Sequence, residues 1–232
     1  MTDITFPTYP KIQSLWKRNP KGNLVLPGQF ASQAIRDLKD AVWYWTEKID
    51  GTNIRFYWDG VKVHLGGRTD NAQFTDHIRN SLMALIDIDA WRAEFGDTHV
   101  IVFGEGYGAG IQKGGGYRDT PGFITFDIQM GGHWGINLSC PFIGHGSMSA
   151  VAHRLGFDVV KTLDCTTVLD AWDKMENRFY ESTYPGHELE GIVGRPEQPF
   201  YLREAVRMTP VMCKMKYVDV DQLPPKPTLD GA

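Results

Sequence analysis

The chain has 232 residues, of which 42% are hydrophobic and 22% charged, and its formal net charge at pH 7 is -4. This composition is typical of a folded globular protein and excludes an intrinsically disordered chain. The negative net charge excludes a protein that holds nucleic acid through a global positive field, so such a contact would need a local basic patch. At this length the chain can form one large domain or two small domains.

The cysteines and the apolar segments indicate the cellular compartment in which the protein functions. The three cysteines are odd in number and lack the spacing of metal ligands, which favours reduced thiols over a disulfide framework. The N-terminus has no apolar segment typical of a signal peptide, and no apolar run approaches membrane length. We therefore expect a cytoplasmic protein that does not associate with a membrane.

Residues from about 1 to 28 are predicted to form a basic N-terminal arm rich in proline, glycine and lysine. Four cations surround Trp16 in this arm: Lys11, Lys17, Arg18 and Lys21. Basic residues interleaved with an aromatic side chain can bind a phosphate backbone. The alternative is that Trp16 and Ile12 pack on the domain surface. After the arm, the spacing of apolar residues over Gln29–Asp40 predicts a short amphipathic helix.

The middle of the chain predicts an antiparallel meander followed by mixed elements. Apolar residues alternate around the turn signal Asp59-Gly60, which predicts paired strands at Asn53–Trp58 and Val61–Leu65. Further strands are predicted at His99–Phe103 and Phe123–Ile128, and helices at Phe74–Asp87, Ser147–Leu155 and Thr167–Phe179.

The alternation along one strand and the spacing along one helix assign residues to a face of each element. Alternation along the strand Phe123–Ile128 places Ile124, Phe126 and Ile128 on one face and Phe123, Thr125 and Asp127 on the other. The helix Thr167–Phe179 has an apolar face formed by Val168, Trp172, Met175 and Phe179.

The last predicted strand, within Val211–Tyr217, places two lysines on one face. Residues two apart in a strand share a face, so Lys214 and Lys216 point together. Their like charges repel each other, which is tolerable in solvent and useful if both bind one anion. From about residue 219 to 232 the prolines predict an extended tail, in which no second folded domain fits.

The stretch Thr46–Asn53 carries the main chemical hypothesis, with Lys48 as a covalent nucleophile. A lysine attacks phosphorus only as the neutral amine, so a nucleophilic lysine needs neighbours that favour this form. The alternative interpretation is structural. Asp50-Gly51 between alternating apolar residues is also a strong hairpin signal, which would make Lys48 an ordinary lysine at a strand end.

Six motifs in order resemble those of the covalent nucleotidyltransferase superfamily, which contains the ATP-dependent ligases and the capping guanylyltransferases. They are Lys48-Ile49-Asp50-Gly51, Arg68, Phe103-Gly104-Glu105, Phe126-Asp127, Glu190-Gly191 and Lys214-x-Lys216. Within the superfamily, Thr46–Arg55, Gly66-Gly67-Arg68-Thr69 and Gly104–Gln112 look most like the nick-sealing RNA ligases of the RNA ligase 2 type. The resemblance spans roughly residues 9 to 218.

This resemblance implies a fold and an activity. The fold is α+β, an ATP-grasp-like ligase adenylation domain of antiparallel sheets with flanking helices, formed by 1–232 as a single domain without an OB-fold domain. The activity is ATP-dependent RNA ligation. Lys48 would take AMP from ATP as a lysyl-AMP, AMP would pass to a 5′-phosphate, and a 3′-hydroxyl would then displace AMP.

The resemblance also implies the role of each residue. The catalytic residues would be Lys48, Lys214 and Lys216, and the ATP-binding residues Glu47, Asp50, Asn53, Arg68, Glu105, Phe126, Lys214 and Lys216. Glu105 would accept from the ribose hydroxyls, Phe126 would stack on adenine, and the backbone at Glu47 would read the adenine amino group. Glu190 would bind Mg²⁺ or Mn²⁺. Structural roles remain the alternatives for Phe126, as a core residue, and for Arg68, as a loop cation.

The implied partner is nucleic acid, namely RNA, with a nicked duplex or an RNA/DNA hybrid as alternative forms. Asp50 departs from the histidine of the classical nick-sealing RNA ligases, so a minimal ATP-dependent DNA ligase stays open. A non-catalytic nucleotide-binding or nucleic-acid-binding module is the alternative from another class. The sequence names no protein partner.

Overall fold

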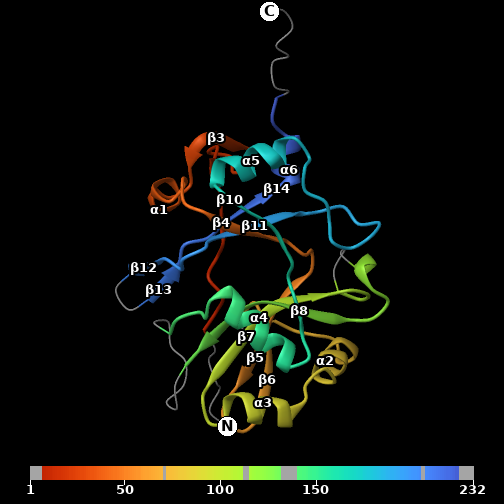
Figure 1. Ribbon diagram of the computed structural model, residues 1–232. Helices are drawn as coiled ribbons and strands as arrows, with labels where there is room; N and C mark the ends of the chain where they lie inside the picture. Colours follow the sequence, from red (N-terminus) through yellow and green to blue (C-terminus); the bar gives the residue numbers. More distant parts are fainter. Residues whose placement is uncertain (1–6, 70–71, 112–114, 132–139, 205–206, 225–232) are drawn as a thin grey trace, which may run out of the picture.

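Two five-stranded sheets organise the chain, and Figure 1 shows them one above the other with helices at the top and at the bottom. The computed structural model describes residues 7–69, 72–111, 115–131, 140–204 and 207–224. The strand orders are β1-β14-β11-β4-β10 and β6-β5-β7-β8-β9. Only β1–β14 and β8–β9 pair in parallel within these two sheets as described. The α+β prediction of antiparallel-rich sheets with flanking helices is confirmed.

The first sheet gathers strands from both ends of the chain. They are β1 (Gln13–Ser14), β4 (Trp43–Glu47), β10 (Thr162–Thr166), β11 (Gly191–Pro196) and β14 (Cys213–Lys216). The helices beside this sheet are α1 (Gln33–Asp37), α5 (Val168–Glu176) and α6 (Tyr217–Asp221). Tryptophans dominate the core between them, with Trp43 and Trp45 fully buried. Cys213 and Met215 point into this core, so Lys214 and Lys216 share the opposite face, as predicted.

The second sheet does not form the predicted meander, because the third of its strands along the chain pairs with the first and not with the second. It contains β5 (Thr52–Trp58), β6 (Val63–Gly67), β7 (Val100–Tyr107), β8 (Gly122–Met130) and β9 (Asp158–Val159). Its core is covered by α2 (Asp76–Met83), α3 (Ile88–Phe95) and α4 (His145–Arg154). The β5–β6 hairpin confirms the predicted pair. Its turn holds Gly60 at φ 88°, and the Asp59 side chain accepts from two backbone N–H groups that follow.

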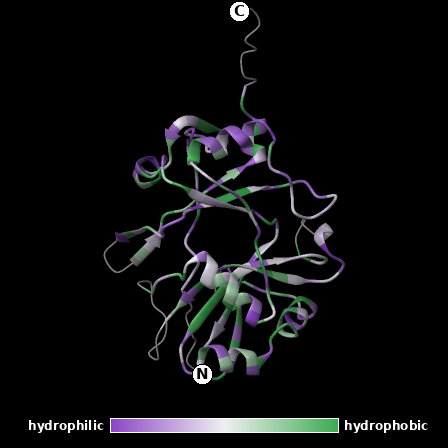
Figure 2. Cartoon of the chain, in the orientation of Figure 1, coloured by the Kyte–Doolittle hydropathy of each residue, from purple (hydrophilic) through white to green (hydrophobic). Residues whose placement is uncertain are grey.

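Two smaller pairs complete the described structure. β2 (Trp16–Arg18) pairs with β3 (Val25–Phe30), β12 (Tyr201–Glu204) pairs with β13 (Arg207–Pro210), and a short 3₁₀ helix covers Gly115–Tyr117. Figure 2 shows hydrophobic residues concentrated in strands of both sheets, with mixed colouring on the helices. Among the described helices, none has both the length and the hydropathy needed to cross a membrane.

The chain crosses from one sheet to the other directly after Lys48. β4 pairs with β10 and β11, whereas β5 pairs with β6 and β7. A hairpin at Asp50-Gly51 is therefore wrong, although the turn signal is present. The reason is tertiary: the apolar residues on the two sides of the signal belong to different cores, so the two strands never pair.

The face assignment along β8 is wrong in part, because the strand contains a β-bulge. Phe103 pairs with Asp127 while Gly104 pairs with Thr125, so Phe126 is an extra residue on β8. The insertion reverses the alternation. Phe123 and Ile128 share one core, and Phe126 and Asp127 both face the other side of the sheet.

Element ends differ from the predictions in several places. Residues predicted as the start of a helix over 29–40 belong to β3, where Phe30 packs on the buried Trp16, and α1 is correspondingly short. Phe179 is 65% exposed instead of buried, because α5 ends at Glu176 and Arg178 has φ 56°. A helical turn, α6, occupies the start of the tail predicted as extended from about residue 219, and residues 225–232 lie outside the described residues.

Candidate active site

A pocket of about 450 Å³ lies between the two sheets and brings together most of the predicted site residues. Glu47, Lys48, Asn53, Arg68, Glu105, Phe126 and Lys214 all line this nucleotide-sized pocket. They come from six strands or strand ends and from both sheets. The predicted residues are thus neighbours in space although they span most of the chain. We call this cavity the inter-sheet pocket.

Lys48 lies where the chain passes from the first sheet to the second. Its backbone N–H donates to the Gly191 carbonyl at 2.9 Å, which ties the end of β4 to the start of β11. Gly51 then passes so close to β7 that an added Cβ would meet the Gly106 carbonyl oxygen at 2.2 Å. The side chain of Lys48 keeps 23% of its surface exposed. The backbone of Lys48 is therefore fixed, while its side chain stays partly exposed.

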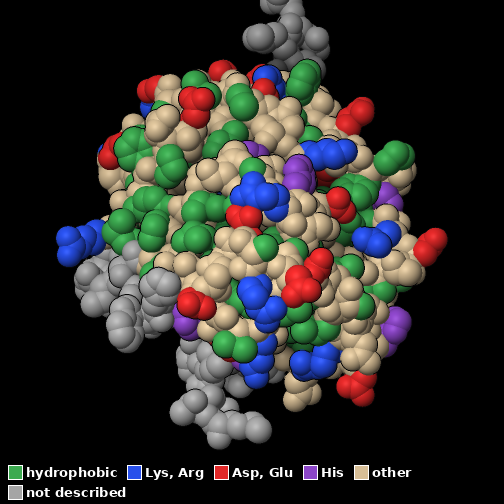
Figure 3. Space-filling model, turned by 60° about the horizontal axis from the view of Figure 1, so that its bottom comes forward, with side chains coloured by type: hydrophobic (Ala, Val, Ile, Leu, Met, Phe, Trp, Pro, Cys, Tyr) green, Lys and Arg blue, Asp and Glu red, His purple; other side chains and the backbone are tan. Residues whose placement is uncertain are grey.

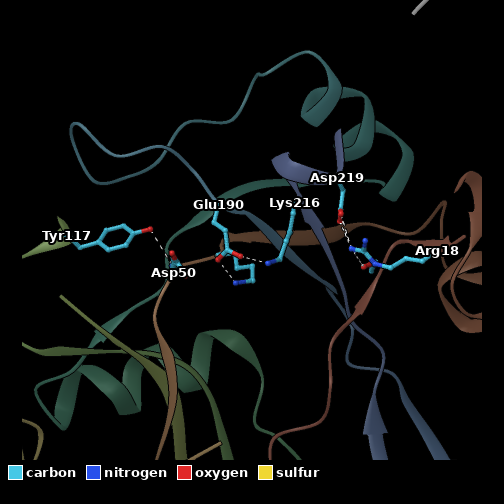
Figure 4. Close-up of polar contacts among 8 residues, drawn as sticks. Arg18, Asp50, Tyr117, Glu190, Lys216 and Asp219 are labelled. Atoms are coloured by element: carbon cyan, nitrogen blue, oxygen red, sulfur yellow. Dashed lines mark hydrogen bonds and ion pairs between the residues drawn. The ribbon is translucent and has the colours of Figure 1, made fainter. Parts of the chain in front are cut away.

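Glu190 joins two of the predicted catalytic lysines. The Lys48 ammonium donates to one of its carboxylate oxygens, and Lys216 Nζ lies 2.5 Å from the other (Figure 4). Burial alone would raise the pKa of Glu190, but Lys48 and Lys216 outweigh burial and hold this pKa below its ordinary value. In this arrangement Lys48 and Lys216 share one carboxylate.

Lys214 lines the inter-sheet pocket without sharing that carboxylate. Burial, together with the ammonium groups of Lys216 and Lys48, lowers the pKa of Lys214. Burial is the larger cause, and the positive charges of Lys216 and Lys48 add to it by repelling that of Lys214. A bound anion would relieve this repulsion, as the sequence suggested for two lysines on one strand face.

Glu105 and Asn53 are directly opposite each other on β7 and β5. Burial raises the pKa of Glu105 to about 8, with the nearby Lys48 acting in the opposite direction. The Asn53 Oδ1 atom is buried in the pocket wall and has no hydrogen-bond partner among the described residues. Buried polar atoms normally have a partner, so this orphan acceptor fits a pocket that receives a polar ligand.

Phe126 presents its ring to the pocket because of the β-bulge. The ring is half-buried and packs edge-on against Tyr9, with 4.9 Å between the ring centres. Val160 and Val193 also line the pocket. Together these apolar side chains form walls suited to a planar ring such as a nucleobase.

The carboxylate of Glu47 has a structural role. The side chain is 2% exposed and accepts from Ser182 Oγ at 2.6 Å and from the Thr183 N–H at 2.9 Å. It therefore anchors the loop that leads to Glu190. The Glu47 N–H donates to Lys161 O, so a backbone contact to an adenine amino group would have to use the Glu47 carbonyl oxygen.

Asp50 does not line the inter-sheet pocket. It faces a larger adjoining cavity of about 1080 Å³, which Glu190 also lines. Its backbone N–H donates to the Tyr117 hydroxyl at 3.3 Å (Figure 4). Asp50 and Lys216 are therefore the two predicted ATP-binding residues that do not line the inter-sheet pocket, and Lys216 is linked to it through Glu190 and Lys48.

Sequence reasoning missed a buried polar cluster at the rear of the pocket. Tyr9 donates to Asp127 Oδ2 at 2.5 Å, and Arg195 donates to both Tyr9 and Asp127 at 2.7 and 2.6 Å. Although burial would lower it, the pKa of Arg195 is raised by the adjacent Asp127. One signal was available in the sequence, since Arg195 follows the apolar run 191–194 and an arginine in a buried strand requires an acidic partner.

A divalent ion fits this site only together with phosphate oxygens. The described part of the chain contains no group of three Asp, Glu, His or Cys side chains arranged to hold a metal. Mg²⁺ commonly takes one or two carboxylates and completes its shell with substrate phosphates and water. Glu190, which lines the larger cavity and contacts Lys48 of the inter-sheet pocket, supplies such a carboxylate.

Solved structures with the same fold define the structural class. An archaeal ATP-dependent RNA ligase (form 2) is 15% identical with a TM-score of 0.58, covering 89% of this chain and 48% of that chain. A lysine-to-methionine variant of Naegleria gruberi RNA ligase with AMP and Mn is 14% identical with a TM-score of 0.60, covering 90% of this chain and 57% of that chain. At these identities the likeness shows the fold, which is that of the nucleotidyltransferase domain of RNA ligases.

The family follows from the sequence match. The model of the RNA ligase family matches residues 41–216, most of the chain, so the chain belongs to the RNA ligase family. No curated protein matches the chain. The chain spans about half the length of the solved ligases, 48% of the archaeal structure and 57% of the Naegleria structure.

Proposed function

We propose that the protein is an ATP-dependent RNA ligase that joins 5′-phosphate to 3′-hydroxyl ends through a lysyl-AMP on Lys48. The observation that carries the proposal is the inter-sheet pocket, in which an accessible lysine, a buried carboxylate, an aromatic ring and two further cations converge. Family membership supports the same chemistry. AMP and Mn accompany the Naegleria ligase in its structure, which supports ATP and a divalent ion as the requirements here.

The residues of the pocket have complementary roles in this proposal. Phe126 stacks on adenine, Glu105 bonds to the ribose, and Asn53 and Arg68 orient the phosphates. Lys214 and Lys216 neutralise the charge that develops on the α-phosphate during attack, which is the principal source of rate enhancement in phosphoryl-type transfer. Lys48 forms the phosphoamide bond as pyrophosphate leaves, and it loses a proton in that step.

The contact between Lys48 and Glu190 must open before the amine can attack. Glu190 keeps Lys216 as a second partner, so its carboxylate is not left alone when Lys48 leaves. Glu190 is then the residue that would hold Mg²⁺ or Mn²⁺ beside the phosphates. Such an ion supplies charge neutralisation on the transferring phosphate.

We propose RNA as the acceptor, with nicked duplex RNA or an RNA/DNA hybrid as the forms to compare, and the cytoplasm as the compartment. The odd number of cysteines, namely Cys140, Cys165 and Cys213, supports a reducing compartment. Asp50 is the specific observation that keeps a DNA nick in the comparison, because the classical nick-sealing RNA ligases carry histidine at this position.

Sealing assays test the proposal. The protein would be incubated with Mg²⁺ and ATP, GTP or NAD, and with 5′-labelled nicks in RNA, DNA and hybrid duplexes. We expect joining with ATP and with an RNA-containing nick, and none by Lys48→Ala. Lys62→Ala is the matched control, because Lys62 is an exposed lysine at the β5–β6 turn. Joining by Lys48→Ala, or no joining of any nick by the wild type, would refute the proposal.

A further inference from the structure

We propose that Lys11, Arg68 and Lys214 form a cradle for one phosphate group at the mouth of the inter-sheet pocket, with Lys11 as its unassigned member. The identity of the phosphate rests on the proposed function. The cradle itself rests on the positions and charges of the three side chains. Lys11 lies outside the segment that the family model matches, so the motifs do not identify it.

The three cations reach the pocket from three separate parts of the fold. Lys11 precedes β1, Arg68 follows β6 of the second sheet, and Lys214 lies in β14 of the first sheet. The N-terminal segment is fixed against the first sheet, because β1 runs parallel to β14 with Ser14 opposite Lys214. The cradle therefore spans both sheets and includes a chain segment that packing holds in place.

None of the three forms an ion pair with an acidic side chain within the described ranges. The other cations of the site do: Lys48 and Lys216 share Glu190, and Arg195 is paired with Asp127. Glu105 is the carboxylate of this pocket that acts electrostatically on Arg68, and its pKa of about 8 leaves it largely protonated at pH 7. Glu190 acts electrostatically on Lys214 without lining this pocket, and Lys11 and Arg68 have no ion-pair partner among the described residues, so positive charge is in excess at the pocket mouth.

This local excess of positive charge contrasts with the negative net charge of the whole chain. The net charge is -4, and on the face shown in Figure 3 acidic and basic side chains are interspersed. Lys11 and Arg68 are exposed, so holding them near each other costs little desolvation and leaves them free to contact a ligand. A phosphate matches such a site, because its oxygens accept from ammonium and guanidinium donors in charge-assisted hydrogen bonds.

Two phosphate sources fit the same cradle in turn. In-line displacement places the departing pyrophosphate opposite the Lys48 amine, and the incoming RNA 5′-phosphate later attacks from that same side. The β- and γ-phosphates of ATP and the RNA 5′-phosphate would therefore occupy one region at successive steps. The shared chemistry is a terminal phosphate group held by three cations.

Calorimetry with inorganic pyrophosphate tests the cradle directly, using the wild type, Lys11→Gln and Lys11→Arg. Binding of 5′-phosphorylated against 5′-hydroxyl RNA to the adenylylated protein gives the second arm. We expect Lys11→Gln to weaken binding in at least one arm by about tenfold, the scale of one charge-assisted hydrogen bond, and Lys11→Arg to retain it. Lys17→Gln is the control, because Lys17 is an exposed lysine of the same segment that does not line the pocket.

Each outcome bears on the cradle. Loss with pyrophosphate alone assigns Lys11 to the nucleotide phosphates, loss with RNA alone assigns it to the 5′-phosphate, and either supports the cradle. Unchanged binding in both arms, or an equal loss in Lys17→Gln, would overturn it. Pyrophosphate binding needs no adenylylation, so a protein that binds pyrophosphate through Lys11 without forming lysyl-AMP would refute the ligase function and leave the cradle intact.

Discussion

Replacing Glu105 by glutamine should stabilise the ligand-free protein above neutral pH. Burial raises the pKa of this carboxyl from 4.5 to about 8, so the folded protein holds its proton more tightly than the unfolded chain does. A raised pKa of this kind makes a contribution to stability that is complete below about pH 4.5 and is lost as pH rises through about 8. Glutamine is neutral at every pH, so the variant avoids this loss.

The magnitude follows from the shift and from the environment of the side chain. Each pKa unit corresponds to about 1.36 kcal/mol, so a fully enclosed carboxyl with this shift would lose on the order of 5 kcal/mol between the two limits. Glu105 lines a pocket and keeps partial contact with solvent, which screens the charge. We therefore expect a difference of roughly 2 kcal/mol at pH 9, or about 4–8 °C in melting temperature for a chain of this size.

Thermal melts of the wild type and Glu105→Gln at pH 5, 7 and 9 measure this effect. The difference in melting temperature should grow with pH and nearly vanish at pH 5. Glu188→Gln is the control, because Glu188 is exposed and its replacement should leave the melting temperature unchanged throughout. A Glu105→Gln variant that melts at or below the wild-type temperature at pH 9 would show that this carboxyl is not held in a desolvated site.

Three further substitutions test separate parts of the site. Lys48→Arg should form no lysyl-AMP, because a guanidinium does not deprotonate at working pH; radiolabelled AMP transfer measures this, and any labelling of Lys48→Arg contradicts it. Phe126→Ala should raise the KM for ATP about tenfold or more, since base stacking on an aromatic ring contributes about 1–3 kcal/mol. Phe126→Trp should keep the wild-type KM. Equal KM values for both variants would assign Phe126 to the core instead. Tyr9→Phe should lower the free energy of unfolding by about 1–2 kcal/mol, because it removes the hydroxyl that bonds to Asp127 of β8 and Arg195 of β11. An unchanged urea midpoint would show that these two hydrogen bonds do not stabilise the fold.

Local patterns in the sequence predicted the parts of the site that depend on strand period and motif order. Lys214 and Lys216 share a face because β14 is regular, and its register with β11 brings Glu190 close to Lys216. The hairpin at Asp50-Gly51 could not be excluded from sequence, because the signal is local and the choice of partner strand is not. The structure excludes the hairpin because β4 and β5 pair with different strands.

Other features depend on contacts between residues far apart in the chain. The bulge at Phe126 is set by the register against Phe103, which no alternation along β8 alone reveals. Tyr9 bonds to a residue 118 positions away, and the motif series does not extend to the N-terminal segment that carries it. The Glu47 carboxylate was assigned no contact from sequence, because its partners in the loop before Glu190 are ordinary hydroxyl residues.

The claim that Lys48 becomes covalently linked to AMP is tested most directly by intact mass spectrometry after incubation with ATP and Mg²⁺, followed by peptide mapping of the adduct. We expect one AMP per chain, attached to the peptide that contains Lys48 and absent from Lys48→Ala. An unmodified protein, or an adduct on any other residue, would contradict it.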